Sequence, residues 1–260
     1  MFTNDEILQI ALRQSAIDSG CAPSDFLLPA HRVVISHPHP DARRYLQLPF
    51  ACDLTSYGDN VVASVSPSVA KEVEAYLSGC DAAFCFETPR LHLLEESLAP
   101  HGLSVCFMAE YFLPDIQKLH PLPCEYPMTV LEADALTDMD RAVWHNALSA
   151  ERPQLDRIAV GAYDGEELVG LAGASADCDT MWQIGIDVLP AYRRRGIAAA
   201  LTAKLAIEIL ERGLVPFYCC AWSNIRSART AIRAGFRPAW VQVTAKSKEF
   251  VEGMYGRTRV

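Results

Sequence analysis

The sequence has no apolar stretch long enough to cross a membrane. Its most apolar helical segment, Gly196 to Leu210, is interrupted by Lys204 and Glu208 and falls short of the roughly 20 residues that span a bilayer. The first residues, MFTNDEILQIALRQS, begin acidic and lack the basic patch and continuous apolar run of a signal peptide. We therefore expect a cytoplasmic protein without a membrane partner.

Disulfide and zinc patterns are also missing. The nine cysteines are odd in number and contain no Cys-x-x-Cys pair, which favours reduced thiols in a reducing compartment. We expect no metal site. The chain is 50% hydrophobic and 21% charged, which excludes a disordered or coiled-coil protein. At about 100 to 200 residues per domain, its 260 residues indicate two domains.

Negative charge is concentrated in the first half of the chain. Residues 1–124 hold 7 basic and 15 acidic groups, whereas residues 125–260 hold 16 and 17. Within the second half, Asp187 to Trp240 has nine Arg or Lys against three Asp or Glu. This local excess predicts a small, multiply charged anion as ligand. The net charge of −9 and the lack of interleaved aromatic residues argue against nucleic acid.

Four prolines between Leu113 and Pro127, in a stretch without apolar periodicity, mark the predicted domain boundary. We predict domains at residues 1–120 and 121–260. The first has mixed α and β patterns: helices at Asn4 to Ser19, Ser68 to Leu77 and Pro89 to Leu98, and strands at His31 to His37, Asn60 to Val65 and Gly102 to Phe112.

The second domain also mixes strand and helix patterns. The turn Asp164-Gly165 between two β runs is a strong hairpin signal, and Gly213 is typical of a helix end. We predict strands at Met128 to Glu132, Arg157 to Tyr163, Glu167 to Ser175, Met181 to Val188, Pro216 to Trp222 and Ala239 to Thr244. We predict helices at Asp138 to Ala150 and Ile197 to Arg212, and one capped by Ser223 or Asn224 that ends at Arg233.

The loop Arg193 to Gly196 runs from a predicted strand directly into a predicted helix. A helix start leaves about four backbone N–H groups without internal partners and adds a partial positive charge. Gly196 and Ala198 to Ala200 are small enough for a phosphate to approach, and the three arginines can reach its oxygens. The alternative is an ordinary Arg-rich turn. The residues of a Walker loop or a GxGxxG motif are absent.

This run resembles the acetyl-CoA signature of the GCN5-related N-acetyltransferases, Gln/Arg-x-x-Gly-x-Gly/Ala, matched here by Arg193, Gly196 and Ala198. A second family motif follows, in which Asn224 opens a helix, Ser227 has the family spacing and Gly235-Phe236 closes the helix. The resemblance covers roughly residues 128–245. It implies an α/β (α+β) fold with a mixed, mostly antiparallel central sheet flanked by helices, preceded here by a smaller α+β N-terminal domain.

The resemblance also implies acetyl-CoA as co-substrate. Its pyrophosphate would bind the N–H groups of Arg194 to Ala199, and its pantetheine would lie between the strands ending at Val188 and Trp222. The N–H near Val188 would polarise the thioester carbonyl, which makes Val188 catalytic. The donor-binding residues implied are Ile186, Val188, Arg193, Arg194, Arg195, Gly196, Ile197, Ala198, Ala199, Asn224 and Ser227.

Two positions depart from the family pattern. Many members place a tyrosine seven residues after the motif Asn to protonate the leaving thiolate, where this chain has Ala231. Some members place a glutamate base at the position of Cys219. No histidine lies beyond His145, so a base would have to be a carboxylate or a water chain, and Asp187 is the candidate. A thiolate with a pKa near 8 to 9 leaves tolerably without an acid.

The activity that the resemblance implies is direct transfer of an acetyl group from acetyl-CoA to a primary amine of a small molecule. The acidic first half favours a cationic acceptor. The residues at 219 and 231 leave open a non-catalytic acyl-CoA-binding or sensing protein. The role of the first domain and the formation of a homodimer also stay open.

Overall fold

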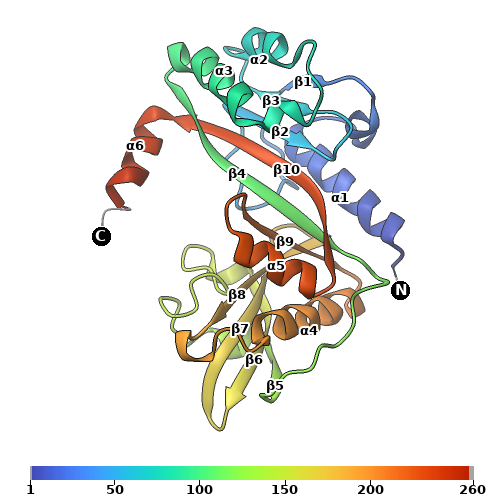
Figure 1. Cartoon of the computed structure of the whole chain (residues 1–260), viewed down its shortest axis with the longest axis vertical. Helices are drawn as coiled ribbons and strands as arrows, with labels where there is room; N and C mark the ends of the chain where they lie inside the picture. Colours follow the sequence, from blue (N-terminus) through green and yellow to red (C-terminus); the bar gives the residue numbers. More distant parts are fainter. Residues whose placement is uncertain (1, 258–260) are drawn as a thin grey trace. The chain divides into compact units, whose positions relative to one another are not determined.

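The computed structural model describes residues 2–257, and Figure 1 shows their helices and strands. The chain forms two compact units. Unit 1 comprises Met1–Ala11 and Tyr111–Pro238, and unit 2 comprises Leu12–Glu110 and Ala239–Val260. Each unit is therefore built from two separate stretches of chain. The domains at 1–120 and 121–260 stay a prediction, because compactness does not test whether a segment folds alone.

Five strands lie side by side in unit 1 (Figure 1). All neighbouring pairs are antiparallel except β8 with β9, which is parallel. The predicted hairpin turn joins β6 and β7, with Gly165 at a φ of 60°. The prediction of an α/β fold with a mostly antiparallel sheet is confirmed. In sheet order the strands are β9 (Val215–Ala221), β8 (Met181–Val188), β7 (Glu167–Ser175), β6 (Asp156–Asp164) and β5 (Met128–Glu132).

Two helices cover one face of these strands. Leu201 and Leu205 pack with Val160 in a continuous apolar core, while Lys204 and Glu208 stay partly exposed and pair across one turn at 3.7 Å. The helix that contains Leu201 and Leu205 is rich in Ala and Leu, which have high helix propensity. The helices are α4 (Ile197–Glu211) and α5 (Ile225–Arg233).

The opposite face is covered by an irregular segment, and the helix predicted at Asp138 to Ala150 is wrong. After the 3₁₀ turn η4 (Ala133–Leu136), the chain makes isolated turns, such as the one closed by Leu148 N–H and the Trp144 carbonyl. Leu148 and Trp144 are nonetheless buried against the sheet. The apolar spacing thus identified a packed segment but not its backbone conformation.

The backbone of this segment lies directly on two glycines of the sheet. A Cβ on Gly185 would be 1.8 Å from the carbonyl oxygen of Asn146, and one on Gly173 would be 2.0 Å from that of Ala147. The N–H groups of Asn146 and Ala147 donate to the carboxylate of Asp187. Because these backbone groups are committed to the sheet, they do not form helical hydrogen bonds.

The strands of unit 2 lie in the order β1, β3, β2, β10, β4. β1 and β3 are parallel, whereas β2 is antiparallel to both β3 and β10. One face packs against two helices in a second apolar core. The strands are β1 (Arg32–Ile35), β2 (Cys52–Ser56), β3 (Val62–Val65), β4 (Leu103–Pro114) and β10 (Phe236–Ser247), and the helices are α2 (Ala70–Leu77) and α3 (Thr88–Leu98).

Buried polar side chains are a feature of unit 2. Asp53 of β2 is 1% exposed and accepts hydrogen bonds from Gln242 Nε2 at 2.8 Å and Thr244 Oγ1 at 2.7 Å. Burial raises the pKa of Asp53 to about 6. Asp18 and Arg43 form a buried ion pair at 2.5 Å in the same unit. Unit 2 therefore has one apolar core and a separate polar interior.

The remaining elements complete the two units. The predicted helix at Asn4 to Ser19 is confirmed as α1 (Asn4–Ser19). Within residues 2–257, no helix has the length and apolar character needed to cross a bilayer. The other helical segments are η1 (Pro23–Leu27), η2 (Phe84–Phe86), η3 (Ala99–His101), η5 (Pro153–Leu155), η6 (Pro190–Tyr192) and α6 (Lys248–Arg257).

Candidate functional site

The loop between β8 and α4 has a strained backbone. Among residues 2–257, Arg194 is the one non-glycine residue with a positive φ, at 68°, a conformation that costs an L-residue about 1–2 kcal/mol. Gly196 follows with a φ of 84° and serves as the N-cap of α4. Such strain clusters at ligand clamps and active sites. The loop is thus held in one shape at the start of the helix.

The start of α4 presents free backbone donors. Its first hydrogen bond runs from the N–H of Ala200 to the carbonyl of Gly196, at 3.1 Å. The N–H groups of Ile197, Ala198 and Ala199 therefore precede the first bonded residue and have no acceptor within the helix. Together with the partial positive charge of the helix start, they form an anion site.

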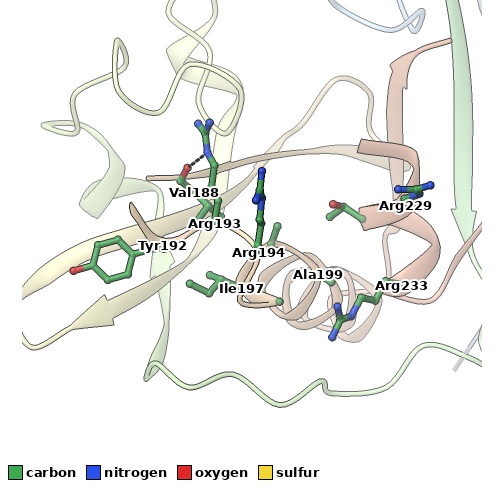
Figure 2. Close-up of a pocket in the computed structure, with 11 residues that line it drawn as sticks. Val188, Tyr192, Arg193, Arg194, Ile197, Ala199, Arg229 and Arg233 are labelled. Carbon is green, nitrogen blue, oxygen red and sulfur yellow. Dashed lines mark hydrogen bonds between the residues drawn. The ribbon is translucent and has the colours of Figure 1, made fainter. Parts of the chain in front are cut away.

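A cavity of about 240 Å³ opens at this helix start (Figure 2). Four of its lining residues are arginines and none is acidic. Seven of the predicted donor-binding residues line it: Val188, Arg193, Arg194, Gly196, Ile197, Ala198 and Ala199. Sequence reasoning missed four others, which are Tyr192, Arg229, Thr230 and Arg233. The basic excess between residues 187 and 240 was the signal available for the two α5 arginines.

The three arginines of the loop have different surroundings. Arg193 donates from Nε to the carbonyl of Val188 at 2.9 Å, so it ties the loop to the end of β8 (Figure 2). Arg195 donates to the hydroxyl of Tyr126 at 2.5 Å and lies 5.5 Å from the ring centre of Tyr192. Arg195 does not line the cavity. Of the three loop arginines, Arg194 is the one that lines the cavity without a side-chain hydrogen bond to another described residue.

Tyr192 connects this loop to the β6–β7 hairpin. Its hydroxyl lies 3.0 Å from a carboxylate oxygen of Asp164 and 3.1 Å from one of Glu167. The hydrogen bond to Asp164 and the adjacent negative charge raise the pKa of Tyr192 to about 12. Tyr192 thus stays neutral at physiological pH and supports the ring contact with Arg195.

Strands β8 and β9 separate beside the cavity. Their parallel pairing runs from Met181 with Val215 to Ile184 with Tyr218, while β8 stays paired with β7 as far as Val188. The N–H of Leu189 donates to Val169 on the β7 side. Because donors alternate along an antiparallel ladder, the N–H groups of Ile186 and Val188 point the other way, toward the gap.

Asn224 and Ser227 lie at the far side of this gap, at the start of α5. Asn224, one of the two predicted capping residues, is the N-cap, and its Oδ1 accepts from the N–H of Ser227 at 3.1 Å. The Ser227 hydroxyl is 2.7 Å from that of Tyr218 on β9. Burial raises the pKa of Tyr218 to about 12. Neither Asn224 nor Ser227 lines the cavity at the α4 start.

The two positions that depart from the family pattern are accommodated differently. Ala231 is fully buried in the core of unit 1, so a larger side chain there would require repacking. Cys219 of β9 is partly buried, and its sulfur lies 3.2 Å from Nε2 of Gln183. The first position is therefore part of the core.

Asp187 binds the irregular segment on the sheet face opposite α4. Its carboxylate accepts from the backbone N–H of Asn146 at 2.8 Å, from that of Ala147 at 3.0 Å and from the Asn146 side chain at 2.6 Å. A carboxylate has about four lone-pair sites, and three are used here. The Asn146 amide nitrogen also lies 3.0 Å from Nε2 of His145. Asp187 is thus firmly engaged in structure.

Residues 121–239 match the family model described as GNAT acetyltransferase. This match includes the Arg-Gly loop, the start of α5 and Gly235-Phe236. A search of curated proteins gave no match.

Two solved structures are similar to part of this chain. A putative GNAT-family acetyltransferase from Novosphingobium aromaticivorans is 21% identical, with a TM-score of 0.42, and the match covers 55% of this chain and 66% of that one. A GCN5-related N-acetyltransferase from Kribbella flavida is 19% identical, with a TM-score of 0.47 and coverage of 60% and 63%. The chain thus spans just under two thirds of each relative. The C-terminal half of the chain, residues 121–239, belongs to the GNAT acetyltransferase family.

Proposed function

We propose that the protein is an acetyl-CoA-dependent N-acetyltransferase that passes the acetyl group directly to a primary amine of a small molecule. The observation that carries this proposal is the cavity at the start of α4, which combines free backbone N–H groups with four arginines and no carboxylate. Its position within the family match supports a CoA ester as the anion bound.

Different parts of acetyl-CoA would bind to different parts of the site. Its pyrophosphate would accept hydrogen bonds from the N–H groups of Arg194 to Ala199, and Arg193 holds this loop to Val188. Its pantetheine would lie in the gap between β8 and β9, where Ile186 and Val188 present backbone groups much as a sheet edge does. Asn224 and Ser227 would contact the pantetheine from α5.

The chemistry consists of one acyl transfer. The amine nitrogen attacks the thioester carbonyl, a C–N bond forms and the C–S bond breaks, and the amine proton is lost while the thiolate gains one. The N–H of Val188 would stabilise the negative oxygen of the tetrahedral intermediate. Holding amine and thioester together supplies much of the rate.

We propose that Asp187 acts on the amine acceptor, in one of two ways. It either takes the amine proton through its one remaining lone-pair site or fixes Asn146 and Ala147 beside the acceptor. Asp187→Asn separates these roles by the pH profile of turnover. A rate lost at neutral pH and regained at high pH identifies a base, whereas a uniform loss identifies a positioning residue.

We further propose that the acceptor is cationic. Residues 1–124 carry 15 acidic and 7 basic groups, and such a charge excess attracts cations at low ionic strength. A panel of polyamines, aminoglycosides and neutral amines would test this. Neutral amines that react faster than cationic ones of equal size would contradict it.

A non-catalytic acyl-CoA sensor is the second candidate. It is favoured by Ala231, which is buried where many family members carry a catalytic tyrosine. CoA release with the amine panel distinguishes the two functions. Release that depends on an acceptor supports the enzyme, and saturable binding without release supports the sensor.

The first test is isothermal titration with acetyl-CoA, with ATP as a competing anion. Gly196→Glu places bulk and negative charge at the anion site and should abolish binding. Gly213→Glu is the matched control, because Gly213 also has a positive φ, of 78°, with no neighbour within 4 Å of an added Cβ, but ends α4. Retained binding by folded Gly196→Glu would contradict the assignment.

A further inference from the structure

Two arginines of α5 extend the cationic surface beyond the Arg-Gly loop. Arg229 and Arg233 are four residues apart, so they lie on one face of the helix about 5–6 Å apart at Cβ, and both line the cavity (Figure 2). The Arg233 guanidinium would be 3.5 Å from a Cβ placed on Gly196. Arg233 therefore lies beside the start of α4, and Arg229 extends the cationic surface one helical turn along α5.

These two guanidinium groups are available to a ligand. In the part of the chain that the structure describes, no carboxylate pairs with Arg229 or Arg233. By contrast, Arg193 is engaged with Val188 and Arg195 with Tyr126. Both α5 arginines are also exposed.

The charge of the cavity exceeds what one phosphate group requires. Backbone N–H groups at the helix start suffice to bind a single phosphate or pyrophosphate. Coenzyme A carries, besides its pyrophosphate, a phosphate monoester on the ribose, with a charge of about −1.5 to −2 at pH 7. Planar guanidinium groups bind such a phosphate bidentately.

We propose that Arg229 and Arg233 form a second phosphate subsite, which recognises the ribose 3′-phosphate of coenzyme A. This inference rests on the proposed donor site and adds a specificity to it. The protein selects 3′-phosphorylated CoA esters over their dephosphorylated forms. Arg233 comes within 4 Å of a Cβ placed on Gly196 of the loop, whereas Arg229 does not.

The test compares CoA with 3′-dephospho-CoA by isothermal titration at fixed salt. Wild-type protein should bind CoA at least about tenfold more tightly. In the double variant Arg229→Gln/Arg233→Gln this ratio should fall to about 1, mostly through weaker binding of CoA. Arg226→Gln is the matched control, because it removes the same charge from an exposed position of α5 that does not line the cavity.

Each outcome decides the inference. A wild-type ratio near 1 overturns it, as does an equal effect of Arg226→Gln, which would indicate a general field of positive charge. A lower ratio in Arg229→Lys/Arg233→Lys than in wild type supports bidentate recognition, since lysine keeps the charge. Binding of neither compound by the wild type would instead overturn the proposed donor site.

Discussion

Gly185→Ala tests the close approach between the sheet and the irregular segment. The added Cβ would lie 1.8 Å from the carbonyl oxygen of Asn146 and 2.8 Å from its carbonyl carbon. A normal C···O contact is about 3.3–3.6 Å, so the segment must move by about 1.5 Å. The obstructing atoms are backbone, and rotation of a side chain cannot relieve the overlap.

The expected cost combines overpacking with weakened hydrogen bonds. Overpacking of this kind costs about 1–3 kcal/mol. The same movement stretches the bonds from Asn146 and Ala147 to Asp187, each worth about 1.5–3 kcal/mol because the acceptor is charged. With partial relaxation we expect a total of about 3 kcal/mol, and hence a Tm lower by about 6–12 °C.

Thermal unfolding and amide hydrogen exchange together provide the assay. The exchange of the Asn146 and Ala147 amides should accelerate in Gly185→Ala, because their acceptor is displaced. Gly253→Ala is the control: Gly253 lies in α6 with nothing within 4 Å of an added Cβ, so alanine should be neutral or stabilise by about 0.5–1 kcal/mol. A Gly185→Ala protein with wild-type Tm and wild-type exchange would refute the reasoning.

Three further substitutions test the interior and the caps. Asp53→Asn concerns pH: because the folded pKa of about 6 exceeds the ordinary 3.8, the contribution of Asp53 to stability is fully present below about pH 4, and about 3 kcal/mol is lost as the pH rises through about 6. Urea unfolding across this range should show that fall in wild type but not in the variant, and equal slopes would contradict it. Ala231→Tyr should destabilise by about 1–3 kcal/mol or more, because the site is fully buried; an unchanged urea midpoint would disprove the packing. Asn224→Ala removes the α5 cap and should cost about 1 kcal/mol, with faster exchange of the Ser227 amide as its local signature.

Elements whose residues show a complete local signal were predicted well. The strands at Met128 to Glu132, Glu167 to Ser175 and Met181 to Val188 have the predicted bounds, because each is a short, mainly apolar run that contains at least one β-branched residue. α4 ends one residue before the predicted position, since Gly213 marks the end of a helix in the sequence itself.

Elements set by distant partners were not predicted. β2 is fully buried yet contains Asp53 and Thr55, so its polar residues resembled a loop until Gln242 and Thr244 supplied hydrogen bonds. The segment at 138–150 has helical apolar spacing, but its conformation depends on Gly185, which lies far along the chain. The residues within β2 or within the segment at 138–150 do not reveal these distant partners.

The candidate site divides in the same way. Motif spacing identified the loop and the start of α4 as lining residues, because an anion site there follows from local backbone geometry. It could not show that Arg195 turns to Tyr126, or that Arg229 and Arg233 reach the cavity. Those facts depend on how α5 packs beside α4. The roles of the predicted site residues in binding and catalysis stay predictions.

The pairing of β2 with β10 has a consequence for biosynthesis. Asp53 and Gln242 are 189 residues apart in the chain, and β2 gains its second neighbour only when residues 241–245 arrive. Until then, one edge of β2 is unpaired in the nascent chain, and the Asp53 carboxylate, which is buried in the folded protein, is exposed to water. Open edges promote association between chains. A ribosome that stalls anywhere between these two strands would thus hold an aggregation-prone intermediate, which makes this the stage at which we expect chaperone dependence.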